Sequence, residues 1–343
     1  MKEGGHFEEK ITVFEKLLDA VIIEKISPEV YCRKYLGHLL DHRKYYLTIY
    51  ADVLEKLISH SEKKATEIAM IDFGAGNGLL GIFAKYCGFK NVFINDIDKK
   101  FVDASRNLAM QMQVMIDGYI PGDIHNVQSF FKNEMPDAIL GTDVIEHIYS
   151  LEDFFSTIKK INPSMASVFT TASNPKNYFK TRQLKKLHLK DEYEGGTPDD
   201  FILFGDSALE PFFKTRQNII YAQLGSTDEA TILKLAKATR GMNEADILAV
   251  IKNYKINGMI PLPPIHPTNT CNPLNGSWTE RILKMEEYIS IYNSNGMKLE
   301  LYNGFYDEHK TGLKKILNKT LNMAVLSLGS TFAPYIIFVG SKK

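Results

Sequence analysis

The sequence predicts an α/β fold: a mostly parallel sheet with helices on both faces. Short apolar runs alternate with segments of helical periodicity between residues 66 and 171. A glycine-rich turn, D-F-G-A-G-N-G at residues 72–78, joins the first run to the first helical segment. Such alternation is typical of parallel sheets, because the helix that connects two parallel strands packs on one face or the other.

Helices are expected before the sheet, within residues 7–60. Two apolar stripes with helical spacing predict them: Ile11, Phe14, Leu18, Val21 and Ile22, and then Tyr46, Ile49, Tyr50, Val53, Leu57 and Ile58. Between the stripes, residues 35–46 read Y-L-G-H-L-L-D-H-R-K-Y-Y and are rich in tyrosine and histidine. We interpret this stretch as a helix interface, since amphipathic aromatic side chains usually pack; a lid over a pocket is the alternative.

The elements of the sheet follow in order. Strands are predicted at residues 67–73, 92–95, 119–120, 137–142 and 165–171, and helices at 79–87, 97–112 and 151–161. After a long interruption the pattern returns with a helix at 278–292, a strand at 298–302, a helix near 310–327 and a strand at 335–339. Residues 320–341 are uncharged, but polar residues, glycine and proline interrupt them, so a helix end and a buried strand explain them better than a membrane span.

Residues 176–277 form the interruption, which starts after Asn174-Pro175. They contain a basic run, an acidic run, two helical patterns near 227–239 and 243–254, and a proline-rich loop. We therefore expect four parts: an N-terminal helical segment (1–62), a core (63–175), a helical cap that selects the substrate (176–277) and the C-terminal part of the core sheet (278–343).

Composition and charge exclude several classes of protein. Lys+Arg and Asp+Glu both number 41 in 343 residues, so the chain lacks the positive field expected of a nucleic-acid-binding protein. Cys32, Cys87 and Cys271 are widely separated and form no C-x-x-C pair, which argues against a disulfide framework and a cysteine zinc site. Because the N-terminus has no apolar signal segment, we expect a cytoplasmic protein without a membrane partner.

Two cofactors compete for the glycine-rich turn. Gly76, Gly78 and Gly81 fit the G-x-G-x-x-G spacing of nicotinamide and flavin sites, whereas Asp72, Gly74, Gly76 and Gly78 fit D-x-G-x-G-x-G. In both cases glycine lets a ligand approach the backbone, and the helix that follows presents free N–H groups. The turn alone leaves the cofactor open.

Acidic residues at the ends of the strands decide between the two cofactors. Asp96 ends the second strand, where a carboxylate can accept hydrogen bonds from the ribose hydroxyls of either cofactor. Asp72, at the end of the first strand, suits a ligand with an ammonium group and is awkward beside a pyrophosphate. A third acid, Asp123 before Ile124, falls where the third strand should end, and residues 136–147 read P-D-A-I-L-G-T-D-V-I-E-H across the fourth.

In this order the motifs resemble those of class I S-adenosylmethionine (SAM)-dependent methyltransferases over about residues 66–175. Residues 136–147 are similar to the fourth-strand motif of the branch that contains quinone-biosynthesis and many small-molecule O-methyltransferases. The resemblance implies a Rossmann-like sheet of seven strands, the last antiparallel, and SAM as the cofactor. It also implies these contacts: Asp72 at the methionine amino group, Gly74, Gly76 and Gly78 under the methionine, Asp96 at the ribose, Asp123 with Ile124 at the adenine, and Thr142 near the sulfonium. Asp96 and Asp123 can instead be turn or helix-capping acids.

Glu146 and His147, which end the fourth-strand motif, are the candidate catalytic residues. Methyl transfer needs near-attack positioning, and a hydroxyl acceptor also benefits from a base, a role that His147 can take. Alternatively, Glu146 and His147 with Asp143 and His188 bind a divalent metal, an arrangement that resembles that of small-RNA 3′-end 2′-O-methyltransferases. A third interpretation gives both residues only structural hydrogen bonds, and we assign no metal from the sequence.

The predicted function is methyl transfer from SAM to a small-molecule or glycan-like acceptor, at an oxygen atom. The alternatives are a metal-assisted RNA 3′-end 2′-O-methyltransferase and a nicotinamide-dependent oxidoreductase. The neutral net charge counts against RNA as a partner, and a cofactor titration separates SAM from nicotinamide.

Overall fold

The computed structural model describes residues 7–132, 135–196, 210–225, 228–262 and 264–342. The chain forms two compact units. Unit 1 consists of Met1–Ile145, Leu151–Thr171 and Glu286–Lys343, and unit 2 of Glu146–Ser150 and Ala172–Met285. The expected cap, residues 176–277, falls inside unit 2, and its role as a cap stays a prediction.

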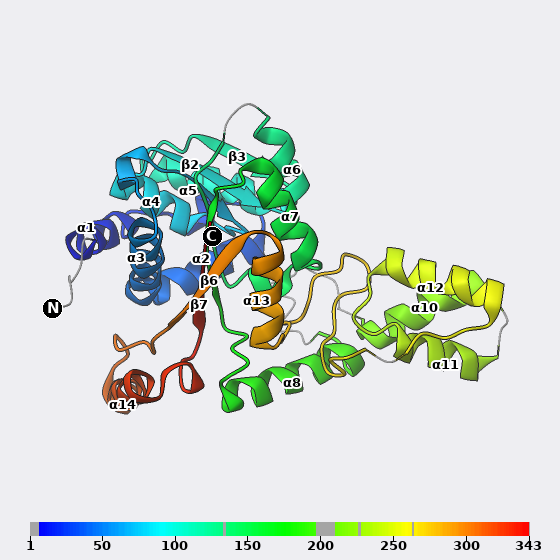
Figure 1. Cartoon of the computed structure of the whole chain (residues 1–343). Coiled ribbons are helices and arrows are strands. Elements are labelled where there is room, and N and C mark those ends of the chain that lie inside the picture. Colours follow the sequence, from blue (N-terminus) through cyan, green and yellow to red (C-terminus); the bar gives the residue numbers. More distant parts are fainter. Residues whose placement is uncertain (1–6, 133–134, 197–209, 226–227, 263, 343) are drawn as a thin grey trace. The chain divides into compact units, whose positions relative to one another are not determined.

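Unit 1 is built on one sheet of seven strands in the order β3-β2-β1-β4-β5-β7-β6 (Figure 1). The strands are β1 (Ala69–Phe73), β2 (Asn91–Asp96), β3 (Gly118–Pro121), β4 (Ala138–Thr142), β5 (Ala166–Thr171), β6 (Met297–Asn303) and β7 (Ile336–Lys342). The first five strands run parallel to one another, and β7 runs antiparallel to both β5 and β6. The predicted fold class, a seven-stranded α/β sheet with an antiparallel last strand, is confirmed.

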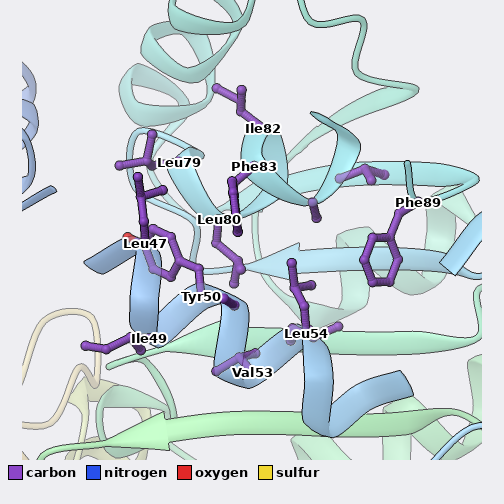
Figure 2. Packing of buried hydrophobic residues seen from close by; sticks show 14 of the residues in the cluster. Leu47, Ile49, Tyr50, Val53, Leu54, Leu79, Leu80, Ile82, Phe83 and Phe89 are labelled. Carbon is purple, nitrogen blue, oxygen red and sulfur yellow. The ribbon is translucent and has the colours of Figure 1, made fainter. Parts of the chain in front are cut away.

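One face of the sheet is covered by helices from the N-terminal segment and the first two crossovers. These are α1 (Glu8–Leu18), α3 (Arg43–Ser59), α4 (Leu79–Cys87) and α5 (Lys99–Gln111), with α2 (Val30–Asp41) beside α3 and α5. Figure 2 shows side chains of α3, among them Tyr50 and Leu54, beside Leu80 and Phe83 of α4. Burial of each such side chain stabilises the fold by roughly 1.5–3 kcal/mol, so this cluster is a main source of stability.

The other face is covered by α6 (Ile124–Phe130), α7 (Leu151–Ile161) and α13 (Met285–Ser294). Aromatic rings dominate the packing there. Phe154 of α7 lies 4.9 Å from Phe73 of β1, and Phe155 lies 4.3 Å from Tyr292 of α13 (ring centroids). The two covered faces explain why the strands are nearly continuous apolar runs in the sequence. α14 (Gly312–Leu328) follows β6.

Unit 2 contains α8 (Tyr178–Tyr193), α10 (Phe212–Leu224), α11 (Glu229–Ala238) and α12 (Glu244–Asn257). Its apolar cluster includes Ile220, Leu235 and Ile247. The guanidinium of the fully buried Arg216 pairs with the Glu192 carboxylate, which also accepts a hydrogen bond from Thr270 Oγ1 at 2.7 Å. A buried pair with such additional bonds fixes the helices in one arrangement, because removing either partner leaves a buried charge.

Two departures from the expected elements have physical causes. The helix predicted at 278–292 begins only at Met285, because the segment before it pairs with other backbone: Trp278 forms a bridge with Cys271. Helix α10 was not predicted, since its pattern places the buried Arg216 among apolar positions. Residues 320–341 form the end of α14 and most of β7, and within the described chain no helix is long and apolar enough to cross a membrane.

Candidate functional site

The glycine-rich turn connects β1 to α4 and requires glycine for two reasons. Gly76 and Gly78 have φ values of +54° and +72°, in the left-handed region that side chains disfavour. A Cβ atom on Gly76 would lie 2.8 Å from Cε1 of Tyr35, so the α2 side chain rests directly on the turn. The turn lies at the N-terminus of α4, where N–H groups and the helix dipole favour a polar ligand.

Asp96 lies at the carboxyl end of β2 and contacts this turn. Its Oδ2 accepts a hydrogen bond from the Gly76 N–H at 2.8 Å, and its Oδ1 accepts one from the Asp98 N–H at 2.9 Å. Burial raises the pKa of Asp96 to about 6. The structure therefore brings together the predicted ribose acid and the predicted turn.

Asp72, at the end of β1, is almost fully buried. Its Oδ2 accepts a hydrogen bond from the Gly81 N–H in the first turn of α4 at 2.7 Å. Burial, and to a smaller extent the negative charge of Asp96, raise the pKa of Asp72 to about 7. Asp72 thus ties the strand to the helix, while its predicted contact with a methionine amino group stays a prediction.

The predicted adenine acid caps a helix. Asp123 Oδ1 accepts hydrogen bonds from the N–H groups of His125 and Asn126, which begin α6, and Ile124 is buried beneath. Asp123 therefore caps the helix, as one of the two interpretations of the sequence expected, and it uses one carboxylate oxygen, Oδ1, to do so. Thr142 is the last residue of β4 and is half-buried. Adenine binding by Asp123 and Ile124, and the place of Thr142 beside the sulfonium, stay predictions.

The tyrosine- and histidine-rich stretch at 35–46 lies near these acids. Burial mainly raises the pKa of Tyr35, and the negative charges of Asp143, Asp96 and Asp72 act in the same direction. Burial and Asp143 also raise the pKa of Tyr46 to about 12. Tyr35, Tyr45 and Tyr46 also pack against the main apolar cluster, and α2 contacts α3, so the interpretation as a helix interface is confirmed; a lid over a pocket stays the alternative.

The candidate catalytic residues lie in unit 2. Glu146 and His147 form a short 3-10 turn with Ile145, and Glu146 Oε1 accepts a hydrogen bond from the Ala172 N–H at 3.3 Å. His188, the distant histidine of the metal hypothesis, is fully buried, and its Nε2 lies 3.0 Å from the Glu280 carbonyl oxygen. Burial lowers the pKa of His188, so its ring is neutral near pH 7.

A glycine turn after β1, an acid at the end of β1 and of β2, and this strand order are those of the class I SAM-dependent methyltransferases, whose cofactor is SAM. The residues present fit that cofactor. The buried carboxylates of Asp72 and Asp96 suit a ligand with positively charged sulfonium and ammonium groups.

Comparison with known proteins agrees with this class. Residues 33–188 match the model of a family described as "Lysine methyltransferase". The ubiquinone biosynthesis O-methyltransferase of Rickettsia akari (strain Hartford) is 23% identical over 128 residues, which are 37% of this chain and 49% of that protein. The chain therefore spans about half the length of this curated relative.

Two solved structures are similar at low identity. The magnesium protoporphyrin IX methyltransferase of Synechocystis PCC 6803, with bound SAH, has 14% identity and a TM-score of 0.41, over 88% of this chain and 86% of that one. A SAM-dependent methyltransferase from Archaeoglobus fulgidus has 12% identity and a TM-score of 0.42, over 90% and 99%. Membership of the branch whose fourth-strand motif residues 136–147 resemble stays a prediction.

Proposed function

We propose that this chain transfers the methyl group of SAM to an oxygen atom of a small-molecule or glycan-like acceptor. The observation that carries the proposal is the buried Asp96 carboxylate held against the Gly76 turn. A carboxylate in this position can accept the ribose hydroxyls, while the turn accommodates the methionine part. The curated relative, an O-methyltransferase of ubiquinone biosynthesis, supports oxygen as the acceptor atom.

Methyl transfer from SAM requires no covalent bond between the protein and the methyl group. The bound cofactor supplies a methyl group that its sulfonium already activates. The protein orients donor and acceptor and excludes water, and a hydroxyl acceptor must lose its proton as the C–O bond forms. We assign Glu146 and His147 to that last task and acceptor selection to residues 176–277, as the sequence predicted.

His147 has the form that accepts a proton. Its Nδ1 lies 2.7 Å from the Trp278 carbonyl oxygen, which can only accept, so Nδ1 carries the hydrogen. The lone pair is then on Nε2. A neutral imidazole with this tautomer can take a proton from a hydroxyl, and it can equally bind a cation.

A second candidate is methylation of a lysine amine. The matched family model is described as "Lysine methyltransferase", and it covers the turn, Asp96 and His147. A neutral amine needs less help from a base than a hydroxyl does. An acceptor panel of hydroxylated aromatics, glycans and lysine peptides, with labelled SAM as the donor, separates the two candidates by the product formed.

Cofactor binding is the first test. Calorimetry should show binding of SAM and S-adenosylhomocysteine, and no comparable binding of NADH. Tight NADH binding without SAM binding would contradict the proposal and favour the oxidoreductase alternative. Methyl transfer to RNA 3′ ends alone would support the remaining alternative.

A further inference from the structure

Two segments of unit 2 that are far apart in the sequence pair through their backbones. The Trp278 N–H donates to the His147 carbonyl oxygen at 3.2 Å, and the Arg281 N–H donates to the Glu146 carbonyl oxygen at 3.1 Å. The 278–281 segment is itself held, because the Thr279 N–H donates to the Thr270 carbonyl oxygen at 3.0 Å. This register fixes the side chain of Glu280 relative to those of Glu146 and His147.

Three potential ligand atoms meet where the segments pair. A carboxylate oxygen of Glu146, a carboxylate oxygen of Glu280 and a ring nitrogen of His147 all lie within 4.8 Å of one another. Two ligands at about 2.1 Å from one ion are at most about 4.2 Å apart, so small side-chain movements suffice to close the group on a cation. Glu146 is only 1% exposed.

The histidine is prepared for coordination. Its Nδ1 is committed to the Trp278 carbonyl oxygen at 2.7 Å, so in the neutral ring the lone pair available for coordination is that of Nε2. Histidines that bind metals generally donate their other N–H to a carbonyl or carboxylate in this way, because that bond fixes the tautomer and the orientation of the ring.

Glu280 is oriented by two further groups of unit 2. Ser173 Oγ donates to Glu280 Oε2 at 3.1 Å, and the Nε2 of the buried His188 donates to the Glu280 carbonyl oxygen at 3.0 Å. Glu280 also has a φ of +45°, a conformation that is uncommon for a residue with a side chain. The strained backbone and its hydrogen bonds direct this carboxylate toward the group.

We propose that Glu146, His147 and Glu280 form a binding site for a divalent cation of the first transition row, such as Mn²⁺ or Zn²⁺. Two carboxylates neutralise a doubly charged ion, and one imidazole favours a transition metal over Ca²⁺ or Mg²⁺. Three protein ligands leave coordination positions open for an oxygen ligand. The set differs from the sequence hypothesis: Glu280 takes part, whereas Asp143 belongs to unit 1 and His188 orients Glu280 from its backbone side.

Metal titration of the full chain tests the site without any need for SAM or an acceptor. After chelator treatment, calorimetry with MnCl₂ and, separately, ZnCl₂ should show one site in the wild type. Glu280→Gln and His147→Gln should each weaken binding by at least tenfold, because each removes a ligand. Glu244→Gln and His266→Gln, in the same unit but outside the group, should bind like the wild type.

A positioning variant keeps the test decisive if a ligand variant fails to fold. Ser173→Ala removes the hydroxyl donor to Glu280 but leaves all three ligands, and it should weaken binding by about tenfold or more. Bound Mn²⁺ should also raise the melting temperature of the wild type and not that of Glu280→Gln. Equal Mn²⁺ and Zn²⁺ affinities for the wild type and Glu280→Gln would overturn the proposal, and so would an equal loss in the controls. Methyltransferase activity can fail independently of either result.

Discussion

The two units differ in how far apart along the chain their functional residues lie. In unit 1, Asp96 bonds to Gly76, 20 residues earlier, across a single strand–helix–strand unit. In unit 2, His147 bonds to the carbonyl of Trp278, 131 residues later, and Glu280 follows two residues beyond that contact. The first group is positioned by local structure, and the second depends on long-range pairing.

This difference separates the roles that each unit can have. Asp96 accepts a hydrogen bond from Gly76, and Asp72 accepts one from Gly81, both near the N-terminus of α4, which is suited to hold a cofactor. Glu146, His147 and Glu280 form a compact set of bases and ligands, which is suited to move a proton or hold a cation. Variants in unit 1 should therefore change cofactor affinity, and variants in unit 2 should change the rate of the chemical step.

The largest effect is expected from His147→Gln. Loss of a base, or of a ligand of the proposed cation site, should lower kcat by about 10²–10⁴-fold, while SAM affinity barely changes, because the proposed cofactor acids are in unit 1. Steady-state kinetics with the acceptor identified by the panel, together with SAM calorimetry, measure both quantities. His266→Gln is the matched control, with unchanged kcat. A wild-type kcat in His147→Gln would exclude a catalytic role.

The contrast between the units also explains what the sequence could predict. The strands are buried on both faces, so in the sequence they are apolar runs bounded by glycine or acidic residues. The order of these acidic residues along the chain then indicates which strand each of them ends. No sequence pattern marks Glu280, which cannot be distinguished from a surface acid in the sequence. Its place is set only in the folded chain, where the Arg281 N–H bonds to the Glu146 carbonyl oxygen. The apolar spacing of 278–292 favoured a helix, and tertiary pairing overrode it up to Met285.

Asp96→Ala should have the next largest effect. It removes a charged hydrogen-bond acceptor from the proposed ribose site, at a cost of about 1.5–3 kcal/mol, so SAM affinity should fall roughly 10- to 150-fold. Calorimetry with SAM and S-adenosylhomocysteine measures the change. Glu280→Gln, in unit 2, should leave SAM affinity within about twofold in metal-free buffer. If Asp96→Ala bound SAM as tightly as the wild type, the carboxylate would have no role in the cofactor site.

The last prediction concerns stability rather than binding or rate, and its sign should differ between the units. In unit 1, burial raises the pKa of Asp72 to about 7, whereas in the unfolded chain this carboxyl ionises near its ordinary value, about 4. The folded state binds the proton more tightly, so the stability linked to Asp72 is full below about pH 4 and is lost as the pH rises through 7. In unit 2, hydrogen bonds from Thr231 lower the pKa of Asp228, the N-cap of α11, so its contribution is present at neutral pH and is lost as the pH falls.

Asparagine variants of both residues test this difference. Asp72→Asn keeps an oxygen to accept the Gly81 N–H but cannot ionise, so at pH 8 it should be more stable than the wild type, by roughly 2–4 kcal/mol, and the gain should shrink toward pH 4. Asp228→Asn should be less stable than the wild type at pH 8, and that difference should also shrink in acid. Thermal melts at pH 4, 6 and 8 without ligand measure both trends. If Asp72→Asn were less stable than the wild type at pH 8, groups within the fold would already stabilise the ionised Asp72 carboxylate. A cationic ligand would then not be needed to stabilise its charge.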